Sequence, residues 1–294
     1  MNFDKSFIRI RRRRLLEIFD LSLKVIRRYP GEFILYLTLG ALMMTVINVA
    51  ITYRIRDGGT WQSSAYSFWT NLVLILIEAQ VGTMFVTSFL GKAMFESRPT
   101  WQNVIQAVIS SWLPMLWTQG FLRGVLLLLL MIGFANLTSN DLTSSIVVAW
   151  LVSIPFLLVR VFRPYAPEII ILERTPMFSK ASNVISLRKR SKSLHSAVTG
   201  DSISLAALTV IFGVLLVLIV YAGIAMTLQL LGLVDDEFWV LVNVAWPVAL
   251  WLVCGVFAVI RFLSYIDNRI RQEGWEVELL IRAEATKMET EATA

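Results

Sequence analysis

Long apolar stretches alternate with short polar segments along most of the chain. A membrane hydrocarbon core about 30 Å thick is crossed by about 20 helical residues. Six stretches approach or exceed this length: 32–53, 67–91, 114–136, 144–162, 204–231 and 238–261. The pattern therefore predicts an all-α fold, a polytopic transmembrane helical bundle of six spans.

The third of these stretches is interrupted, and its pattern fits two arrangements. Residues 101–136 contain Pro114, which removes a backbone donor, and Gly120, which tolerates unusual dihedral angles. One arrangement is a single bent span. The other is an interfacial helix over 101–118 followed by a short span. The sequence leaves both arrangements open.

A shorter amphipathic helix is predicted ahead of the first span, over residues 14–29. Leu16, Phe19, Leu23 and Ile26 recur at helical spacing, and cations occupy much of the remaining surface. This pattern is typical of a helix that lies in the membrane interface with its cations near anionic headgroups. An ordinary solvated helix is the alternative.

Breaks in the pattern divide the chain into three regions. A Pro-Gly pair separates the basic N-terminus and interfacial helix, 1–31, from the six-span membrane domain, 32–262. That domain includes a large polar loop, 163–203. Residues 263–294 are predicted to form a charged C-terminal helix and a disordered tail, because the last residues lack aromatic side chains.

The distribution of cations predicts the orientation in the membrane. Lysine and arginine are concentrated in the N-terminus, in the loop 163–203 and after the last span. The loops 137–143 and 232–237 contain acids and no cation, whereas Arg54 and Arg56 in the first outer loop depart from the trend. Cytoplasmic loops are enriched in cations. We therefore expect a multi-pass protein of the plasma (inner) membrane, with both termini cytoplasmic beside anionic lipid headgroups.

Composition excludes several classes of function. Hydrophobic residues make up 56% of the chain and charged residues 16%, whereas soluble domains carry about 25% charged residues. With Cys254 and His195 as the single residues of their types, a Cys/His zinc site or a His-ligated haem pair lacks ligands. No Walker or G-x-G-x-x-G loop is present for a nucleotide. We expect no cofactor and no bound metal.

Two further chemistries find no support in the motifs. The basic stretch around Arg188 is not accompanied by a fold that reads nucleic acid, so we expect no nucleic-acid partner. A serine hydrolase would need a G-x-S-x-G elbow, which the chain lacks. No residue is therefore predicted to be catalytic.

Glu78 is the most unusual residue within a predicted span. It lies near the centre of the second span beside Gln80, where a charged carboxylate is costly. Arg123 and Arg160 are candidate partners, although both lie nearer the predicted cytoplasmic ends. Glu78 could belong to a proton or ion relay, but the other spans carry few polar groups. A structural polar contact is the favoured interpretation.

A dense set of charges follows the last span, in "RFLSYIDNRIRQEG" (261–274). On one helix, Asp267 and Arg271 form an i,i+4 pair, as do Arg269 and Glu273. Exposed pairs of this kind contribute only about 0.3–0.5 kcal/mol each. We therefore predict that this helix packs against the inner loop. Its expected partners there are Glu173, Arg174, Arg188 and Arg190.

Two segments carry a resemblance to a known group of proteins. They are "YIDNRIRQEGWEVELLIRAEA" (265–285) and "RPYAPEIIILERTP" with "RKRSKSLH" in the inner loop. Both resemble segments of bacterial, planctomycete-type multispanning proteins, which are similar to the membrane domain associated with glycerophosphodiester phosphodiesterases. The resemblance implies a standalone membrane domain with charged residues at its cytosolic face. It does not imply the phosphodiesterase reaction, because the catalytic domain is absent.

These observations favour a non-enzymatic integral membrane protein, an accessory or scaffold subunit of an inner-membrane assembly with a membrane-protein partner. The alternative is a small transporter or lipid-handling protein that uses Glu78 in a cavity. A water-lined cavity that reaches Glu78 would favour transport, and a dry bundle would favour the accessory role.

Overall fold

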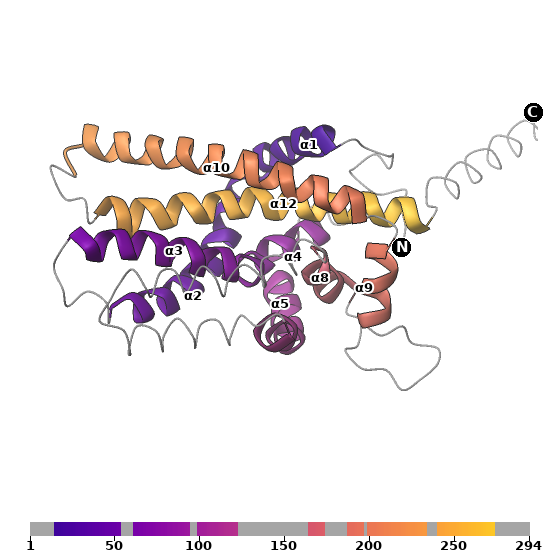
Figure 1. The fold of residues 1–294 in the computed structure, drawn as a ribbon. Helices are drawn as coiled ribbons and strands as arrows, with labels where there is room; N and C mark the ends of the chain where they lie inside the picture. The colour runs from indigo at the N-terminus through magenta and orange to yellow at the C-terminus, as the bar shows by residue number, and fades with distance from the viewer. Residues whose placement is uncertain are drawn as a thin grey trace, which may run out of the picture.

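The computed structural model describes residues 15–53, 61–94, 99–122, 164–173, 187–196, 199–233 and 240–273. The described bundle contains four long α-helices, α2 (Pro30–Tyr53), α3 (Trp61–Gly82), α10 (Thr199–Leu230) and α12 (Trp246–Glu273), and α4 (Met84–Ala93), which continues the direction of α3 (Figure 1). The shorter α-helices are α1 (Leu15–Arg28), α5 (Trp101–Met115), α8 (Ala166–Glu168) and α9 (Leu187–Ser196). Three π-helical segments extend them: η3 (Leu116–Leu122), η4 (Ile169–Glu173) and η5 (Leu241–Ala245). The described residues contain no strand, so the all-α prediction is confirmed for them.

Four described segments are long and apolar enough to cross a membrane. They are Pro30–Val49, Ser67–Ala93, Ala206–Leu230 and Leu241–Gln272. These segments correspond to the first, second, fifth and sixth predicted spans. The third predicted span is described only as far as residue 122, and the fourth, 144–162, lies outside the described residues.

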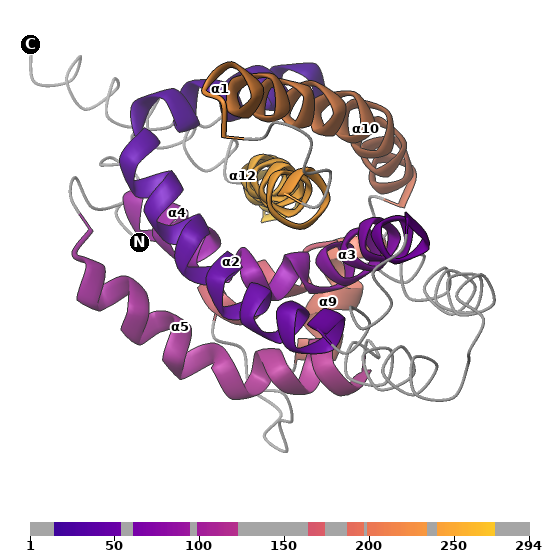
Figure 2. The ribbon, with the colours of Figure 1, turned by 90° about the vertical axis from the view of Figure 1, so that its left-hand side faces the viewer.

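The last helix of the bundle, α12, lies at its centre. Viewed along its axis, α12 is surrounded by α1, α2, α3, α4 and α10 (Figure 2). Ala258, Val259 and Ile260 follow one another on α12, so they point to three different sides of the helix, and all three are buried. A helix that is apolar on all sides needs a fully buried position or a lipid environment. In this bundle α12 has the buried position, and α10, none of whose spanning window is buried, has the outer one.

The predicted amphipathic helix at the N-terminus is present as α1, and it has two apolar sides. Ile18 and Ser22 are buried against the bundle, and Val25 packs beside them. Leu16 and Leu23 are 67% and 61% exposed on another side of the helix. Part of the predicted apolar surface is therefore exposed and does not belong to the core, a pattern that the interfacial interpretation expects.

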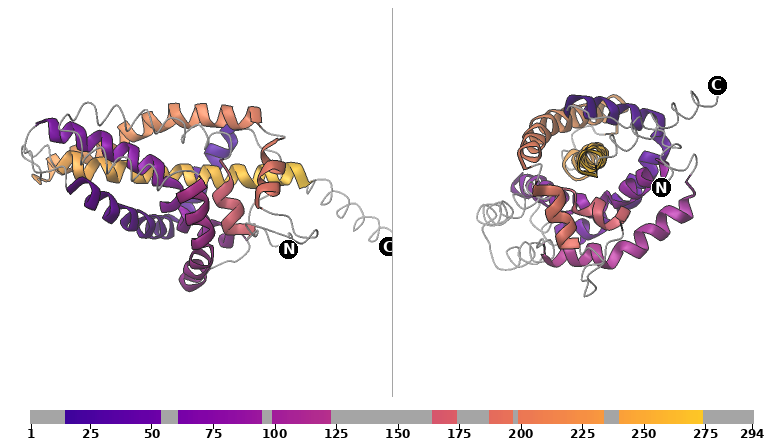
Figure 3. Two further views of the ribbon diagram at one scale, coloured as in Figure 1. Left: turned by 60° about the horizontal axis from the view of Figure 1, so that its bottom comes forward. Right: turned by 90° about the vertical axis from the view of Figure 1, so that its right-hand side faces the viewer.

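The helix α5 runs across the bundle axis instead of along it (Figures 2 and 3). Its buried side chains, which include Val104, Ala107 and Val108, face the bundle, whereas Ile109 and Leu113 are exposed. The helix continues into η3 without a break at Pro114. Of the two arrangements open from the sequence, this geometry favours the interfacial helix.

The backbones of α2 and α3 approach closely at two glycines. A Cβ atom placed on Gly40 would collide with the carbonyl oxygen of Gly82, and one placed on Gly82 would collide with the ring of Trp251. Small residues allow transmembrane helices to approach at backbone distance. The two glycines thus bring α2, α3 and the central α12 together at one level.

Candidate functional site at the C-terminal end of α12

The C-terminal part of α12 carries several charged residues, and most of its side chains are buried against other elements. Tyr265, Asp267 and Ile270 are all almost completely buried. Around this part of α12 lie α8, η4 and α9, which come from the predicted inner loop (Figure 3). The predicted contact between this loop and the end of the last span is confirmed.

The first ion pair joins Arg261 to Glu168. The Nε atom of Arg261 donates to the Oε1 atom of Glu168 at 2.5 Å, and the Glu168 side chain is 0% exposed. The same guanidinium reaches the Thr83 hydroxyl at 3.5 Å. Thr83 lies at the break between α3 and α4. Arg261 therefore ties α12 both to the inner loop and to the second span.

The second cluster is centred on Glu173. Arg190 of α9 binds its carboxylate with two hydrogen bonds, 2.7 Å from Nε to Oε2 and 2.9 Å from Nη2 to Oε1. The Tyr265 hydroxyl donates to Oε1 at 2.6 Å, and Nε of Arg269 lies 3.8 Å from the same oxygen. One carboxylate thus connects η4, α9 and α12.

The π-helical turn of η4 explains why both glutamates face α12. In an α-helix, residues five positions apart are rotated by roughly 140°, since a turn holds 3.6 residues. A π-helix has hydrogen bonds between residues five positions apart, so such residues come back to nearly the same side. Glu168 precedes η4 and Glu173 ends it. Both carboxylates can therefore reach arginines of one neighbouring helix.

The third ion pair lies within α12. The Nη2 atom of Arg271 is 2.8 Å from Oδ2 of Asp267, with the Asp267 side chain 3% exposed. This is the predicted i,i+4 pair, and it is confirmed. The predicted contact of Arg269 with Glu173 is confirmed as well.

Other residues that the sequence singled out are only partly placed. Arg123, Arg160 and Arg174 lie outside the described residues, and of Arg188 and Glu273 only the helical backbone is described. Glu78 is buried in α3, as expected for a polar residue within a bundle. It belongs to a different part of the structure from the charged cluster.

Sequence reasoning missed four members of the cluster as partners: Glu168, Arg261, Tyr265 and Thr83. Arg261, Tyr265 and Arg269 are spaced by four residues each, which places them on one side of α12. The recurrence of polar residues at every fourth position could have indicated a polar side of α12 that contacts another element. Thr83 had no comparable signal, because its role depends on the break between α3 and α4.

The environment of Glu173 lowers the pKa of its carboxyl group. Burial by itself raises the pKa of this carboxyl group, but the hydrogen bonds donated by Arg190 and Tyr265 and the charges of Arg190 and Arg269 outweigh burial. The pKa of Glu173 is therefore lower than its ordinary value of 4.5. An acid with a lowered pKa stays ionised at neutral pH, which suits an ion pair and not a general acid.

This shift predicts a pH-dependent contribution to stability. A lowered folded-state pKa stabilises the protein above the unfolded value of about 4.5, and this stabilisation is lost as the pH falls through the folded value. We expect Glu173→Gln to reduce the free energy of unfolding by about 1.5–3 kcal/mol at pH 7. The difference from the wild type should shrink below about pH 4.5, measured by unfolding in detergent. A difference that stays constant from pH 7 to pH 3 would contradict the ionised cluster.

The geometry of the cluster suits a structural role, because its ion pairs hold neighbouring helices together. Within the described ranges, no group of three or more His, Cys, Asp or Glu residues is arranged to hold a metal ion. Glu168, Glu173 and Asp267 are each held by an arginine of α12 or α9.

Comparison of the chain with protein-family models, with curated proteins and with solved structures gives no match.

Proposed function

We propose that this chain is a non-enzymatic integral protein of the plasma (inner) membrane, an accessory or scaffold subunit that supports a membrane-protein partner. In this proposal the chain has six spans, with both termini in the cytoplasm. It is also a standalone relative of the membrane domain associated with glycerophosphodiester phosphodiesterases. The six-span topology rests on the distribution of cations, and the relationship rests on the two charged segments described above.

One observation carries the proposed role. Glu168 of α8 and Glu173 of η4 are paired with arginines of α12 and α9, and these ion pairs connect the four elements. Such a cluster gives the inner face a fixed shape. A catalytic site would instead need acids or bases that are open to a substrate.

Glu78 offers the test against transport. A transport role would require an aqueous path to this side chain, whereas in the structure Glu78 is 1% exposed. The pocket described below is lined by other residues. In a chain whose native cysteine is replaced (Cys254→Ser), Glu78→Cys should therefore not react in intact cells with a membrane-impermeant thiol reagent.

The same labelling tests the topology. Asp141→Cys and Asp235→Cys should react in intact cells, because both loops are proposed to face outward. Lys189→Cys, on the exposed side of α9, should react only after the membrane is permeabilised. Labelling after denaturation confirms that each thiol is present. Reaction at position 78 would favour the transporter, and protection at both 141 and 235 would reject the topology.

A further inference from the structure

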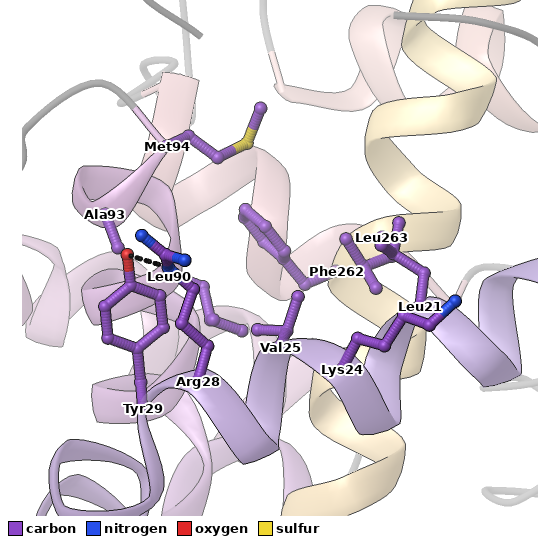
Figure 4. Close-up of a pocket in the computed structure, with 10 residues that line it drawn as sticks. All are labelled: Leu21, Lys24, Val25, Arg28, Tyr29, Leu90, Ala93, Met94, Phe262 and Leu263. Carbon is purple, nitrogen blue, oxygen red and sulfur yellow. Dashed lines mark hydrogen bonds between the residues drawn. The ribbon is translucent and has the colours of Figure 1, made fainter. Parts of the chain in front are cut away.

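A pocket lies between α1, the end of α4 and α12, next to the N-terminal cations. Its volume is about 250 Å³. Val25 of α1, Ala93 of α4 and Phe262 of α12 contribute apolar walls (Figure 4). Pockets for drug-sized ligands enclose about 300–1,000 Å³. This pocket is therefore too small for a whole phospholipid, but it can take part of one acyl chain.

Two cations line the same pocket, and they differ in how they are paired. Lys24 forms an ion pair with Asp20 at 2.6 Å. Arg28 is exposed and has its Nε atom 3.4 Å from the Tyr29 hydroxyl, with the guanidinium 5.7 Å from the centre of that ring. No ion pair joins Arg28 to any described residue. Figure 4 shows the Arg28 guanidinium beside the Tyr29 hydroxyl, pointing away from the amine of Lys24.

The surroundings of the pocket fit a position at the lipid headgroups. Leu16 and Leu23 of α1 are exposed apolar residues, which an interfacial helix places among acyl chains. The pocket touches α4 and α12 where their spanning segments approach the charged cluster. An acyl chain can therefore enter the pocket from the membrane while a headgroup remains near Arg28.

We infer that this pocket binds one acidic phospholipid. The phosphate is held by the Arg28 guanidinium and the Tyr29 hydroxyl, and part of one acyl chain packs against Val25, Ala93 and Phe262. Arginine matches phosphate with two parallel hydrogen bonds. The uncompensated charge of Arg28 favours a lipid with net negative charge over a zwitterionic one. A free phosphate ion would leave the apolar walls unused, which is why the ligand is a lipid.

Arg28 has a matched control in its neighbour. Arg27 is also exposed and also lies in the last turn of α1, but it does not line the pocket. Arg27→Gln and Arg28→Gln remove the same charge from the same helix end. Any general attraction to acidic lipid, and any effect of the helix dipole, is therefore shared by the two variants.

The test measures the melting temperature of the purified full chain in neutral detergent. Phosphatidylglycerol, phosphatidylcholine with the same acyl chains, and inorganic phosphate are titrated separately. A ligand that binds the folded state raises the melting temperature with its concentration. We expect phosphatidylglycerol to stabilise the wild type and Arg27→Gln. Its apparent affinity for Arg28→Gln should be about tenfold weaker, through loss of charge-assisted hydrogen bonds.

A second variant tests the apolar part of the pocket. Ala93→Leu extends a side chain into the pocket while Arg28 remains, and it should also weaken the effect of phosphatidylglycerol. If Ala93→Leu shows no melting transition, the comparison of Arg27→Gln with Arg28→Gln alone decides whether the inference holds. Three results would overturn the inference: equal loss in Arg27→Gln and Arg28→Gln, an equal effect of phosphatidylcholine, or full stabilisation by inorganic phosphate.

Discussion

Replacing Arg261 with methionine is expected to destabilise the folded protein by about 3–5 kcal/mol, because it leaves a buried carboxylate without its cation. The Glu168 side chain is 0% exposed and its Oε1 atom accepts the hydrogen bond from Arg261. Water cannot replace the lost partner without opening the contact between α8 and α12. The measurement is the free energy of unfolding in detergent, for wild type and variant under the same conditions.

Two companion variants separate the ion pair from other effects. The double variant Arg261→Met with Glu168→Leu should recover much of the loss, since a buried pair replaced by apolar groups of similar size is often close to neutral. Lys24→Met removes a cation from an exposed i,i+4 pair and should change stability by at most about 1 kcal/mol. If Arg261→Met unfolds as the wild type does, the pair does not lock these helices.

The second large effect is expected at the crossing of α2 and α3. In Gly40→Ala the added methyl group would meet the carbonyl oxygen of Gly82, which belongs to the backbone and cannot rotate away. The two helices must separate, and the packing of Trp251 beneath Gly82 is disturbed with them. Overpacking typically costs about 1–3 kcal/mol of stability. We expect Gly40→Ala to reduce the free energy of unfolding by about 3 kcal/mol or more, because the clash is with the backbone.

Gly223 of α10 provides the matched control, because a Cβ there has nothing within 4 Å. Gly223→Ala should leave the unfolding midpoint unchanged or raise it slightly, since alanine favours the helix by up to about 1 kcal/mol. Both variants are compared by thermal unfolding in the same detergent. Equal midpoints for Gly40→Ala and Gly223→Ala would contradict the close crossing.

Much of the fold could be predicted from the sequence, because a span is a local property. The length of an apolar run sets whether a helix can cross the membrane, and four runs correspond to described helices that are long and apolar enough to do so. The arrangement could not be predicted in the same way. The apolar parts of α10 and α12 read alike in sequence, yet one faces outward and the other is central. Contacts with distant helices decide between these positions.

The charged cluster was predictable where its partners share one helix or one surface. Asp267 and Arg271 are neighbours on α12, and Arg269 contacts Glu173 where the predicted inner loop packs against the end of this helix. Arg261 was interpreted only as a cation at the end of a span, the position that topology requires anyway. Its pairing with Glu168 depends on how the distant loop segment packs against α12. No sequence pattern used above predicts the π-helical turn that then brings Glu173 to the same side.

The central position of α12 has a consequence for the order in which the bundle is assembled. The ribosome makes α1, α2, α3, α4 and α10 before α12, at about 5–20 residues per second. For that time the inward faces of these helices have no partner at the centre of the bundle. The ion pairs of Arg261, Arg269 and Arg271 also form only after α12 has emerged. The apolar core around α12 and its ion pairs with residues 168 and 173 can therefore be completed only once this last described helix has been made.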